Sequence, residues 1–233
     1  MLVSSFLSQR SNSYVVRLGG VRALAGRTTR AERSRRSLKL SSTVLEEEVD
    51  PGEVAGLRIL KYPSPPLRAS NEDVATFDDD LKKLTKSMFE LMYKAQGVGL
   101  AAPQVGVNKR VMVYNELGDP KKWLSEMVLI NPKIVEKSAK EELETEGCLS
   151  FPGMPVESTR LVSRSSWIKV EAMNLKGKTF KKKFVGWEAR IFQHEYDHLD
   201  GIVYIDHLSP DGKAELQSRL DQLIEQHGPG GAL

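Results

Sequence analysis

Apolar residues recur with helical spacing in three stretches of the chain, and this spacing gives each stretch one apolar face. In the first stretch, Asp78 can cap the helix N-terminus and Gly97 can end the helix. In the last, Ser209-Pro210 supplies a cap followed by a proline in the first turn, and Gly228 ends the pattern. The predicted helices cover residues 78–97, 188–199 and 209–228.

Short strand-like runs separate the first predicted helix from the second. The turn Leu175-Lys176-Gly177-Lys178 joins two of them into a hairpin, whereas Asn131-Pro132 interrupts another. The strands are predicted over residues 110–114, 128–135, 167–173 and 179–185. One helix, a set of antiparallel strands and two further helices predict an α+β fold, with the strands packed around the second helix and the others at the N- and C-terminal ends.

Two segments have no predicted helix or strand. The run Tyr62-Pro63-Ser64-Pro65-Pro66 should form an extended arm, because three prolines fix φ and remove hydrogen-bond donors. The stretch around Leu161–Ser166 suggests an inserted surface loop.

The charge of the chain is divided between two pieces. Residues 1–40 hold nine basic residues and seven serines against one acid, Glu32, for a net charge of +8. The remainder holds the other 25 basic and 30 acidic residues, for a net charge of −5. An N-terminal segment rich in Arg and Ser and poor in acids is typical of an organelle transit peptide, with a disordered basic tail or a nucleic-acid-binding arm as the alternative.

These compositions predict the organisation of the chain. We expect a disordered transit peptide over residues 1–45, a linker over 46–56, a folded domain over 57–228 and a frayed tail over 229–233, in the matrix of a mitochondrion or the stroma of a plastid. The mildly acidic body predicts no direct contact with nucleic acid. The single cysteine excludes an intramolecular disulfide, and no apolar run has the length of a membrane span.

The strongest chemical signal is the hexapeptide QHEYDH at residues 193–198. His194 and His198 are four residues apart on one helical face, so both imidazoles can reach one metal ion. Glu195 can reach a water molecule that the metal activates. A catalytic metal usually has a third protein ligand. His207 fits the usual spacing poorly and is expected to be a polar surface residue, while Cys148 is the other candidate, although a lone cysteine is commonly a buried small hydrophobe.

Three segments occur in a specific order: GVGLAAPQ at 97–104, EGCLSFP at 146–152 and QHEYDHLDG at 193–201. Together they resemble the peptide deformylase family, in the bacterial-type form that also occurs in organelles, over about residues 57–225. The resemblance implies a metal-dependent amidohydrolase that removes the formyl group from N-formyl-methionyl nascent peptides and releases formate. It also implies one Fe²⁺ per chain, which Zn²⁺ or another divalent ion can replace. The organellar ribosome is a further expected partner.

The resemblance also assigns roles to individual residues at the reacting centre. The implied metal ligands are Cys148, His194 and His198. Glu195 would be the general base and acid, while the Gln104 side chain and the backbone N–H of Leu149 would hold the oxyanion.

Substrate binding and support are expected from neighbouring residues. Gly99 would line the cleft, and Val98 would offer main-chain bonds to a peptide bound as an added strand. Val98, Trp187 and Ile191 are the candidate walls of a methionine pocket, with ordinary core packing as the alternative for Ile191.

Two ionic contacts are expected to support the centre. Glu146 should pair with Arg160 and fix the cysteine-bearing segment, unless both are unrelated surface charges. Asp197 is a candidate acceptor for the second N–H of a ligating histidine, with a solvated carboxylate as the alternative.

Two other functions share parts of this pattern. A zincin-type metalloprotease also carries HExxH, but it would not need Cys148. A non-catalytic module with a structural metal site would normally close the coordination with a fourth ligand, and it would have no use for Glu195.

Overall fold

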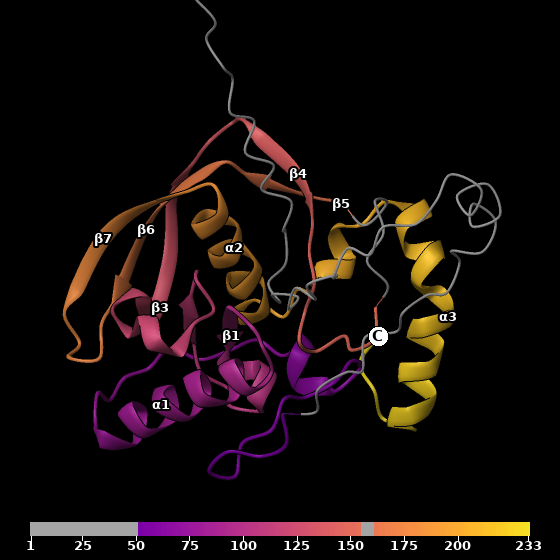
Figure 1. Cartoon of the computed structure of the whole chain (residues 1–233), viewed down its shortest axis with the longest axis horizontal. Helices are drawn as coiled ribbons and strands as arrows, with labels where there is room; N and C mark the ends of the chain where they lie inside the picture. Colours follow the sequence, from indigo (N-terminus) through magenta and orange to yellow (C-terminus); the bar gives the residue numbers. More distant parts are fainter. Residues whose placement is uncertain (1–50, 155–160) are drawn as a thin grey trace, which may run out of the picture.

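The computed structural model describes residues 51–154 and 161–233, and these form a mixed α+β fold, as expected (Figure 1). The expected transit peptide and Arg160 lie outside the described residues. Each of the three predicted helices is present. They are α1 (Asp79–Lys94), α2 (Trp187–Leu199) and α3 (Pro210–His227). The Asp78 side chain accepts from the Leu81 N–H, and the Ser209 hydroxyl accepts from the Gly212 N–H, so both predicted caps are confirmed.

A five-stranded antiparallel sheet has the strand order β1-β2-β3-β6-β7. Its members are β1 (Gly99–Ala101), β2 (Val111–Asn115), β3 (Glu126–Lys137), β6 (Trp167–Met173) and β7 (Thr179–Val185). β3 continues through Asn131-Pro132 because the register shifts there, with Asn131 at a φ of 49°. The predicted hairpin turns at Gly177, whose φ of 70° suits glycine.

A second, two-stranded sheet pairs β4 (Glu141–Thr145) with β5 (Leu161–Ser165). The expectation of a surface loop around Leu161–Ser166 is therefore wrong. β5 is short and carries Arg164 and Ser165 at buried positions, so its sequence lacks the apolar alternation that marks a strand. β1 was also not predicted, because three residues are too few to show a period.

The proline-rich arm differs from the expectation as well. Instead of staying extended, it closes into the 3-10 turn η1 (Pro65–Arg68). Three further 3-10 segments connect the larger elements: η2 (Ala102–Val105), η3 (Pro120–Ser125) and η4 (Tyr204–His207).

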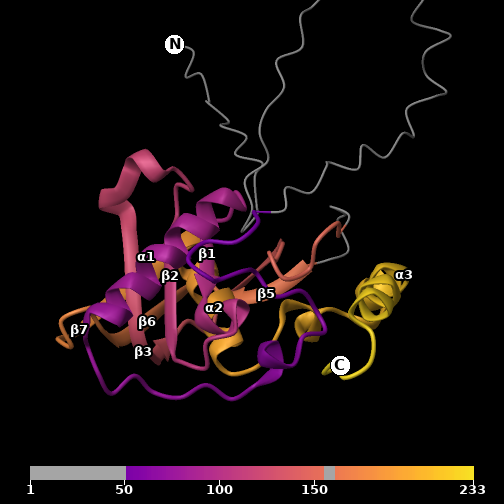
Figure 2. The ribbon, with the colours of Figure 1, turned by 90° about the horizontal axis from the view of Figure 1, so that it is seen from below.

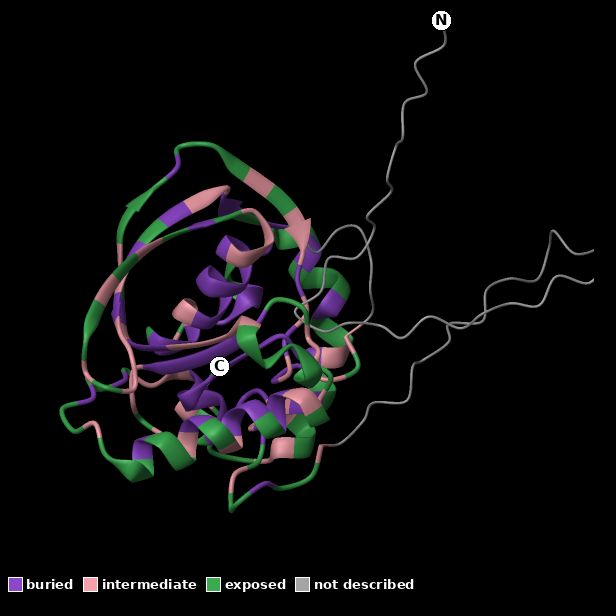
Figure 3. Cartoon of the chain, turned by 60° about the vertical axis from the view of Figure 1, so that its left-hand side comes forward, coloured by how far each residue is buried: buried purple, intermediate pink, exposed green. Residues whose placement is uncertain are grey.

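The helices occupy different sides of the molecule. α2 lies inside the curve formed by β3, β6 and β7, with the β4–β5 hairpin on its other side (Figure 1). α3 lies at the end of the molecule opposite β7 in two perpendicular views (Figure 2). Most of α2 is buried, as the purple ribbon of Figure 3 shows. The HExxH motif at residues 194–198 therefore lies at the centre of the fold.

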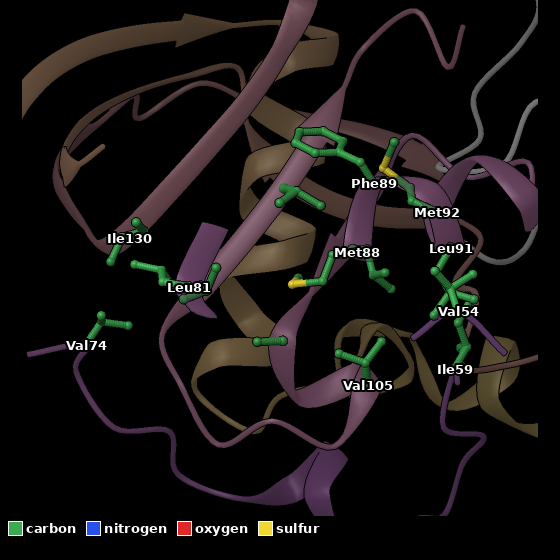
Figure 4. Close-up of a cluster of buried hydrophobic side chains, with 14 residues drawn as sticks. Val54, Ile59, Val74, Leu81, Met88, Phe89, Leu91, Met92, Val105 and Ile130 are labelled. Carbon is green, nitrogen blue, oxygen red and sulfur yellow. The ribbon is translucent and has the colours of Figure 1, made fainter. Parts of the chain in front are cut away.

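Two apolar cores enclose the sheet. One joins α2 to the strands through Phe184, Phe192 and their neighbours. The other gathers α1 residues such as Leu81 and Met88 and the strand residue Ile130 into one cluster (Figure 4). A third cluster links α3 to the arm and includes Cys148.

Both ends of the described chain are part of the fold. Val54 is buried and bridges to Leu57, so the folded body begins inside the expected linker. The tail at 229–233 was expected to be frayed, yet the Ala232 N–H donates to the Pro63 carbonyl at 2.8 Å. Among the described residues, no helix is both long enough and apolar enough to cross a membrane.

Candidate metal centre

The three expected metal ligands come together in the interior. Helix α2 supplies His194 and His198, and Cys148 comes from the irregular segment that follows β4. All three are buried, and their ligand atoms lie within 4.8 Å of one another. The Cys148 sulfur is 3.3 Å from Nε2 of His198. One divalent ion with metal–ligand distances of about 2.0–2.3 Å can reach all three atoms.

The hydrogen bond of His194 fixes which ring nitrogen faces the centre. Its Nδ1 lies 2.9 Å from Oε2 of Glu146, which leaves Nε2 as the free ligand atom. This Nε2 is buried and has no hydrogen-bond partner in the described part of the chain. A buried nitrogen without a partner costs free energy unless it binds something, so the donor set fits a metal ion.

The two histidines have opposite pKa shifts. Burial lowers the pKa of His198 to about 3, which keeps the imidazole neutral and able to bind a metal. Burial also disfavours the charged form of His194, but the nearby Cys148 thiol and Glu146 carboxylate outweigh it and raise the pKa well above its usual value. Metal binding at His194 therefore has to displace a proton.

Glu195 is fully buried beside the ligands. Within residues 51–154 and 161–233, neither carboxylate oxygen has a hydrogen-bond partner. Burial raises the pKa of Glu195 to about 7. Gly99 makes room for this carboxyl group, because a Cβ at position 99 would lie 2.8 Å from Cδ of Glu195. A carboxyl group with a pKa near neutrality can accept and return a proton during a reaction.

Gln104 points its amide nitrogen at the same centre. Its Oε1 accepts from the Ala101 N–H at 2.8 Å, which sets the orientation of the amide. Nε2 then lies 3.6 Å from the Cys148 sulfur and 3.3 Å from the Ser150 hydroxyl. Leu149 follows Cys148 directly, so the two expected oxyanion donors belong to neighbouring segments.

The cysteine-bearing segment is held by a buried ion cluster around Glu146. Arg164 of β5 donates to both carboxylate oxygens at 2.9 Å, and Arg190 of α2 donates to Oε1 at 2.8 Å. Burial alone would raise the pKa of Glu146, but Arg164 and His194 outweigh it and lower the pKa well below the usual value. Glu146 thus links the cysteine segment, the β4–β5 hairpin and the ligand His194.

Sequence reasoning missed both of these arginines. It expected Arg160 as the partner of Glu146, but Arg160 lies outside the described residues, and the two carboxylate oxygens already have three partners. Arg190 could have been found from its position four residues before His194, which places it on the same helical face.

Asp197 does not orient a ligating histidine. Its carboxylate pairs with Arg164 and lies 2.8 Å from Nε2 of His207. The acceptor for His194 is Glu146, so the candidate acceptor role of Asp197 is wrong. His207 is partly exposed and contacts Asp197 outside the cluster of candidate ligands, in agreement with the expectation of a polar surface residue.

The expected substrate residues lie in one apolar cluster. Val98 and Ile191 are buried members of it, and Trp187 packs against it while donating its indole N–H to the Glu116 carbonyl at 3.2 Å. Ile191 has no exposed surface, which is the behaviour of a core residue. Its role as a pocket wall stays a prediction.

β1 is an edge strand of the sheet, and the backbone of the buried Gly99 faces its unpaired edge. The Val98 carbonyl accepts from the Asn115 N–H at 2.8 Å, so Val98 faces β2. Because alternate residues of a strand face opposite edges, the N–H and C=O of Gly99 point away from β2. Main-chain bonds to an added peptide strand are therefore expected from Gly99 rather than from Val98.

Comparisons with known proteins agree with one another. The family model described as polypeptide deformylase matches residues 57–214. A chloroplastic peptide deformylase 1B of Oryza sativa subsp. japonica is 43% identical over 171 residues, which cover 73% of this chain and 62% of the rice protein. A peptide deformylase of Thermotoga sp. (strain RQ2) is 42% identical over 163 residues, which cover 70% of this chain and 93% of that protein. The chain thus spans less than two thirds of the length of the rice relative.

Solved structures give the same result. A plant peptide deformylase crystal structure matches with a TM-score of 0.70 and 40% identity, covering 76% of this chain and 93% of that one. A peptide deformylase from Plasmodium falciparum matches with the same TM-score and identity, covering 73% of this chain and 96% of that one.

Proposed function

The chain belongs to the polypeptide deformylase family, and we propose that it hydrolyses the formyl group from N-formyl-methionyl nascent polypeptides and releases formate. One observation carries this proposal. Cys148, His194 and His198 converge on one point in the interior, with the unpartnered carboxyl group of Glu195 beside them.

A divalent ion fits the residues that converge there. A cysteine thiolate and two imidazoles suit Fe²⁺ and Zn²⁺, and Fe²⁺ is the ion we propose, one per chain. When bound, the ion would supply Lewis-acid activation of the attacking water and the formyl carbonyl. The buried Glu146 would keep His194 in the orientation that directs Nε2 toward the ion.

Glu195 would transfer the proton. Its carboxylate takes a proton from the attacking water as the water oxygen bonds to the formyl carbon. It then gives the proton to the methionine nitrogen as the C–N bond breaks. The pKa of about 7 suits both directions near neutral pH.

The formyl oxygen would be held by two donors. The Gln104 amide is already turned toward the centre by its bond to Ala101, and the Leu149 N–H lies next to the ligand Cys148. Donors of this kind are worth about 3 kcal/mol of barrier in other hydrolases.

The peptide would bind as an added strand on the free edge of β1, bonded to the backbone of Gly99. The methionine side chain would then enter the apolar region of Val98, Trp187 and Ile191. This orientation brings the formyl group to the metal centre.

The two rival functions fit the geometry less well. A zincin-type protease has no need of a cysteine ligand, yet Cys148 lies in the ligand cluster. A structural metal site has no use for a buried carboxyl group without a partner, and the described residues supply three ligands rather than four.

The site of action we propose is a plastid or a mitochondrion, in the stroma or matrix. The Arg- and Ser-rich leader supports import. The rice relative is named as chloroplastic, and an Arabidopsis thaliana relative, 42% identical, as chloroplastic/mitochondrial. Formylated nascent chains on the organellar ribosome would be the substrate.

Formate release from formyl-Met-Ala-Ser tests the proposal. Residues 51–233, purified without oxygen and loaded with Fe²⁺, should release formate, whereas a Glu195→Gln variant should keep the metal and lose about 10²–10⁴-fold in kcat. A blocked peptide with only internal amide bonds is the control for a protease. Absence of formate from the metal-loaded parent protein would overturn the proposal.

A further inference from the structure

The β6–β7 hairpin carries a concentration of positive charge that the catalytic proposal does not use. Residues 167–185 hold six lysines and one acid, Glu171, for a net charge of +5. The rest of residues 51–233 holds 19 basic and 25 acidic residues, for a net charge of −6. The hairpin is therefore strongly basic, whereas the rest of residues 51–233 is acidic.

Strand register puts three of these six lysines on one face of the sheet. Lys169 of β6 lies directly opposite Lys183 of β7, and Glu171 lies between Lys181 and Lys133. We call this surface the basic face. It comprises Lys133, Lys169, Lys181 and Lys183 on the strands and Lys176 and Lys178 beside the hairpin turn. All six are exposed or nearly so, because α2 packs against the opposite face of the sheet.

The lysines of the basic face are only partly neutralised. Lys169 pairs with Glu136 at 2.6 Å and Lys181 with Glu171 at 3.0 Å. The Lys183 ammonium lies 4.3 Å from the centre of the Trp167 ring. In the described part of the chain, Lys133, Lys176 and Lys178 have no carboxylate partner. Like charges opposite each other in a sheet are destabilising, so folding alone does not favour the Lys169–Lys183 pair.

Protection of a free edge explains only part of this pattern. β7 is an edge strand, and lysines on an edge discourage pairing with another chain. However, β3 and β6 are interior strands of the sheet, and the turn lysines lie outside the strands altogether. Edge protection therefore does not account for Lys133, Lys169, Lys176 or Lys178.

The spacing suits a polyanion with repeated charges. Residues on one face of a sheet are about 7 Å apart along a strand and about 5 Å apart between strands. Lysine acts as a point charge on a flexible stem, which suits phosphate contacts that do not depend on sequence. We propose that the basic face binds the phosphate backbone of RNA. This partner rests on the proposed function, because a formylated nascent chain is carried by a ribosome with an RNA surface.

The position of the basic face is compatible with catalysis. β7 and β1 form opposite edges of the sheet, so RNA on β7 leaves the Gly99 edge free for a peptide. The net charge of the body predicted no direct contact with nucleic acid. That expectation came from an average over the whole body, which conceals this local concentration.

The binding test uses residues 51–233, loaded with metal, because the basic leader would itself bind RNA. This segment contains every described element of the fold and all of the residues 57–214 that match the family model. The probe is a fluorescein-labelled RNA hairpin. Affinity is measured between about 0.05 and 0.2 M salt, because binding through phosphate contacts weakens steeply over this range.

The face variant changes Lys133, Lys176, Lys178 and Lys183 to Gln. The control variant changes Lys82, Lys83, Lys86 and Lys94 of α1 to Gln, which removes the same charge. We expect the face variant to bind RNA at least tenfold more weakly, with the slope of log affinity against log salt reduced by about 3, as four lost contacts require. The control should change affinity less than twofold.

Three outcomes would overturn the proposal: no RNA binding by the parent, equal weakening in both variants, or binding to phosphatidylglycerol vesicles without binding to RNA. Formate release from formyl-Met-Ala-Ser should be unchanged in both variants. That activity separates failure of the RNA proposal from failure of the deformylase proposal, because it does not need the basic face.

Discussion

The two halves of the metal centre hold their ligands by different means. On one side, α2 carries His194, Glu195 and His198 within five consecutive residues, so helix geometry alone brings them together. On the other side, Cys148 lies in an irregular segment that depends on distant partners. Gln104 contacts Ser150, the Tyr62 N–H donates to the Ser150 carbonyl at 2.8 Å, and Arg164 pairs with Glu146.

This difference separates local from long-range positioning. A helix keeps its side chains in register as long as its own hydrogen bonds persist. The cysteine segment keeps its place only while a buried carboxylate stays charged and paired. Changes that affect Glu195 on the helix should therefore act on the chemistry, whereas changes around Cys148 should act on metal affinity and stability.

Loss of the cysteine ligand should have the largest effect. A Cys148→Ala variant leaves only two protein ligands, so we expect it to purify with little metal and to release formate at a rate reduced far more than the 10–100-fold that loss of an outer partner costs. Metal content by mass spectrometry and formate release measure both. Full metal content in the variant would favour a zincin-type site, which needs no cysteine.

Gly99→Ala tests the helix side without touching a ligand. The new Cβ would lie 2.8 Å from Cδ of Glu195, so the carboxyl group must move. Displacement of a catalytic group by about 1 Å can cost about 10²-fold in rate. We expect kcat to fall by about that factor while metal content stays at one ion per chain. Loss of metal together with activity would show that Gly99 supports the centre rather than the base.

The same contrast explains which parts of the site could be predicted. The four-residue spacing of His194 and His198 is a local pattern, and it predicted the helix and the convergence of the two imidazoles, both of which are present. Cys148 was reached through the order of three motifs. The pairing of Glu146 with Arg164 joins residues eighteen positions apart, and no local sequence pattern marks it.

The sequence analysis also failed to predict short buried strands that carry polar residues. β5 buries Arg164 and Ser165, so a strand with an ionic function resembled a surface loop. Asp197 is close to the ligands in sequence, but its carboxylate faces Arg164 and His207. Sequence proximity could not distinguish the acid that orients His194 from the acid that does not.

An Arg164→Ala variant tests whether the position of the Cys148 segment depends on the buried charge of Glu146. Removing one partner of a buried ion pair usually costs about 3–5 kcal/mol of unfolding free energy, and loss of an outer partner lowers metal affinity by about 10–100-fold. Urea unfolding and competition with a chelator measure the two effects. Arg68→Ala is the matched control, because its pair with Asp206 is partly exposed and should be worth about 1 kcal/mol or less. Equal effects of the two variants would contradict the role of the Glu146 cluster.

Low pH should destabilise the segment that carries Cys148, because it protonates Glu146. Burial favours its neutral form, but Arg164 and His194 outweigh burial, so the pKa of the folded state lies below the usual value of 4.5. A carboxyl group with a lowered pKa adds stability above its unfolded pKa and loses that stability as the pH falls. The unfolding free energy of the metal-free protein should therefore decrease below about pH 4.5, and a Glu146→Gln variant should lose less over the same interval. Urea unfolding between pH 3 and 7 measures both curves. Parallel curves would show that Glu146 is not the group whose protonation matters, and would leave Asp197, whose pKa is also lowered by His207 and Arg164 against the effect of burial, as the alternative.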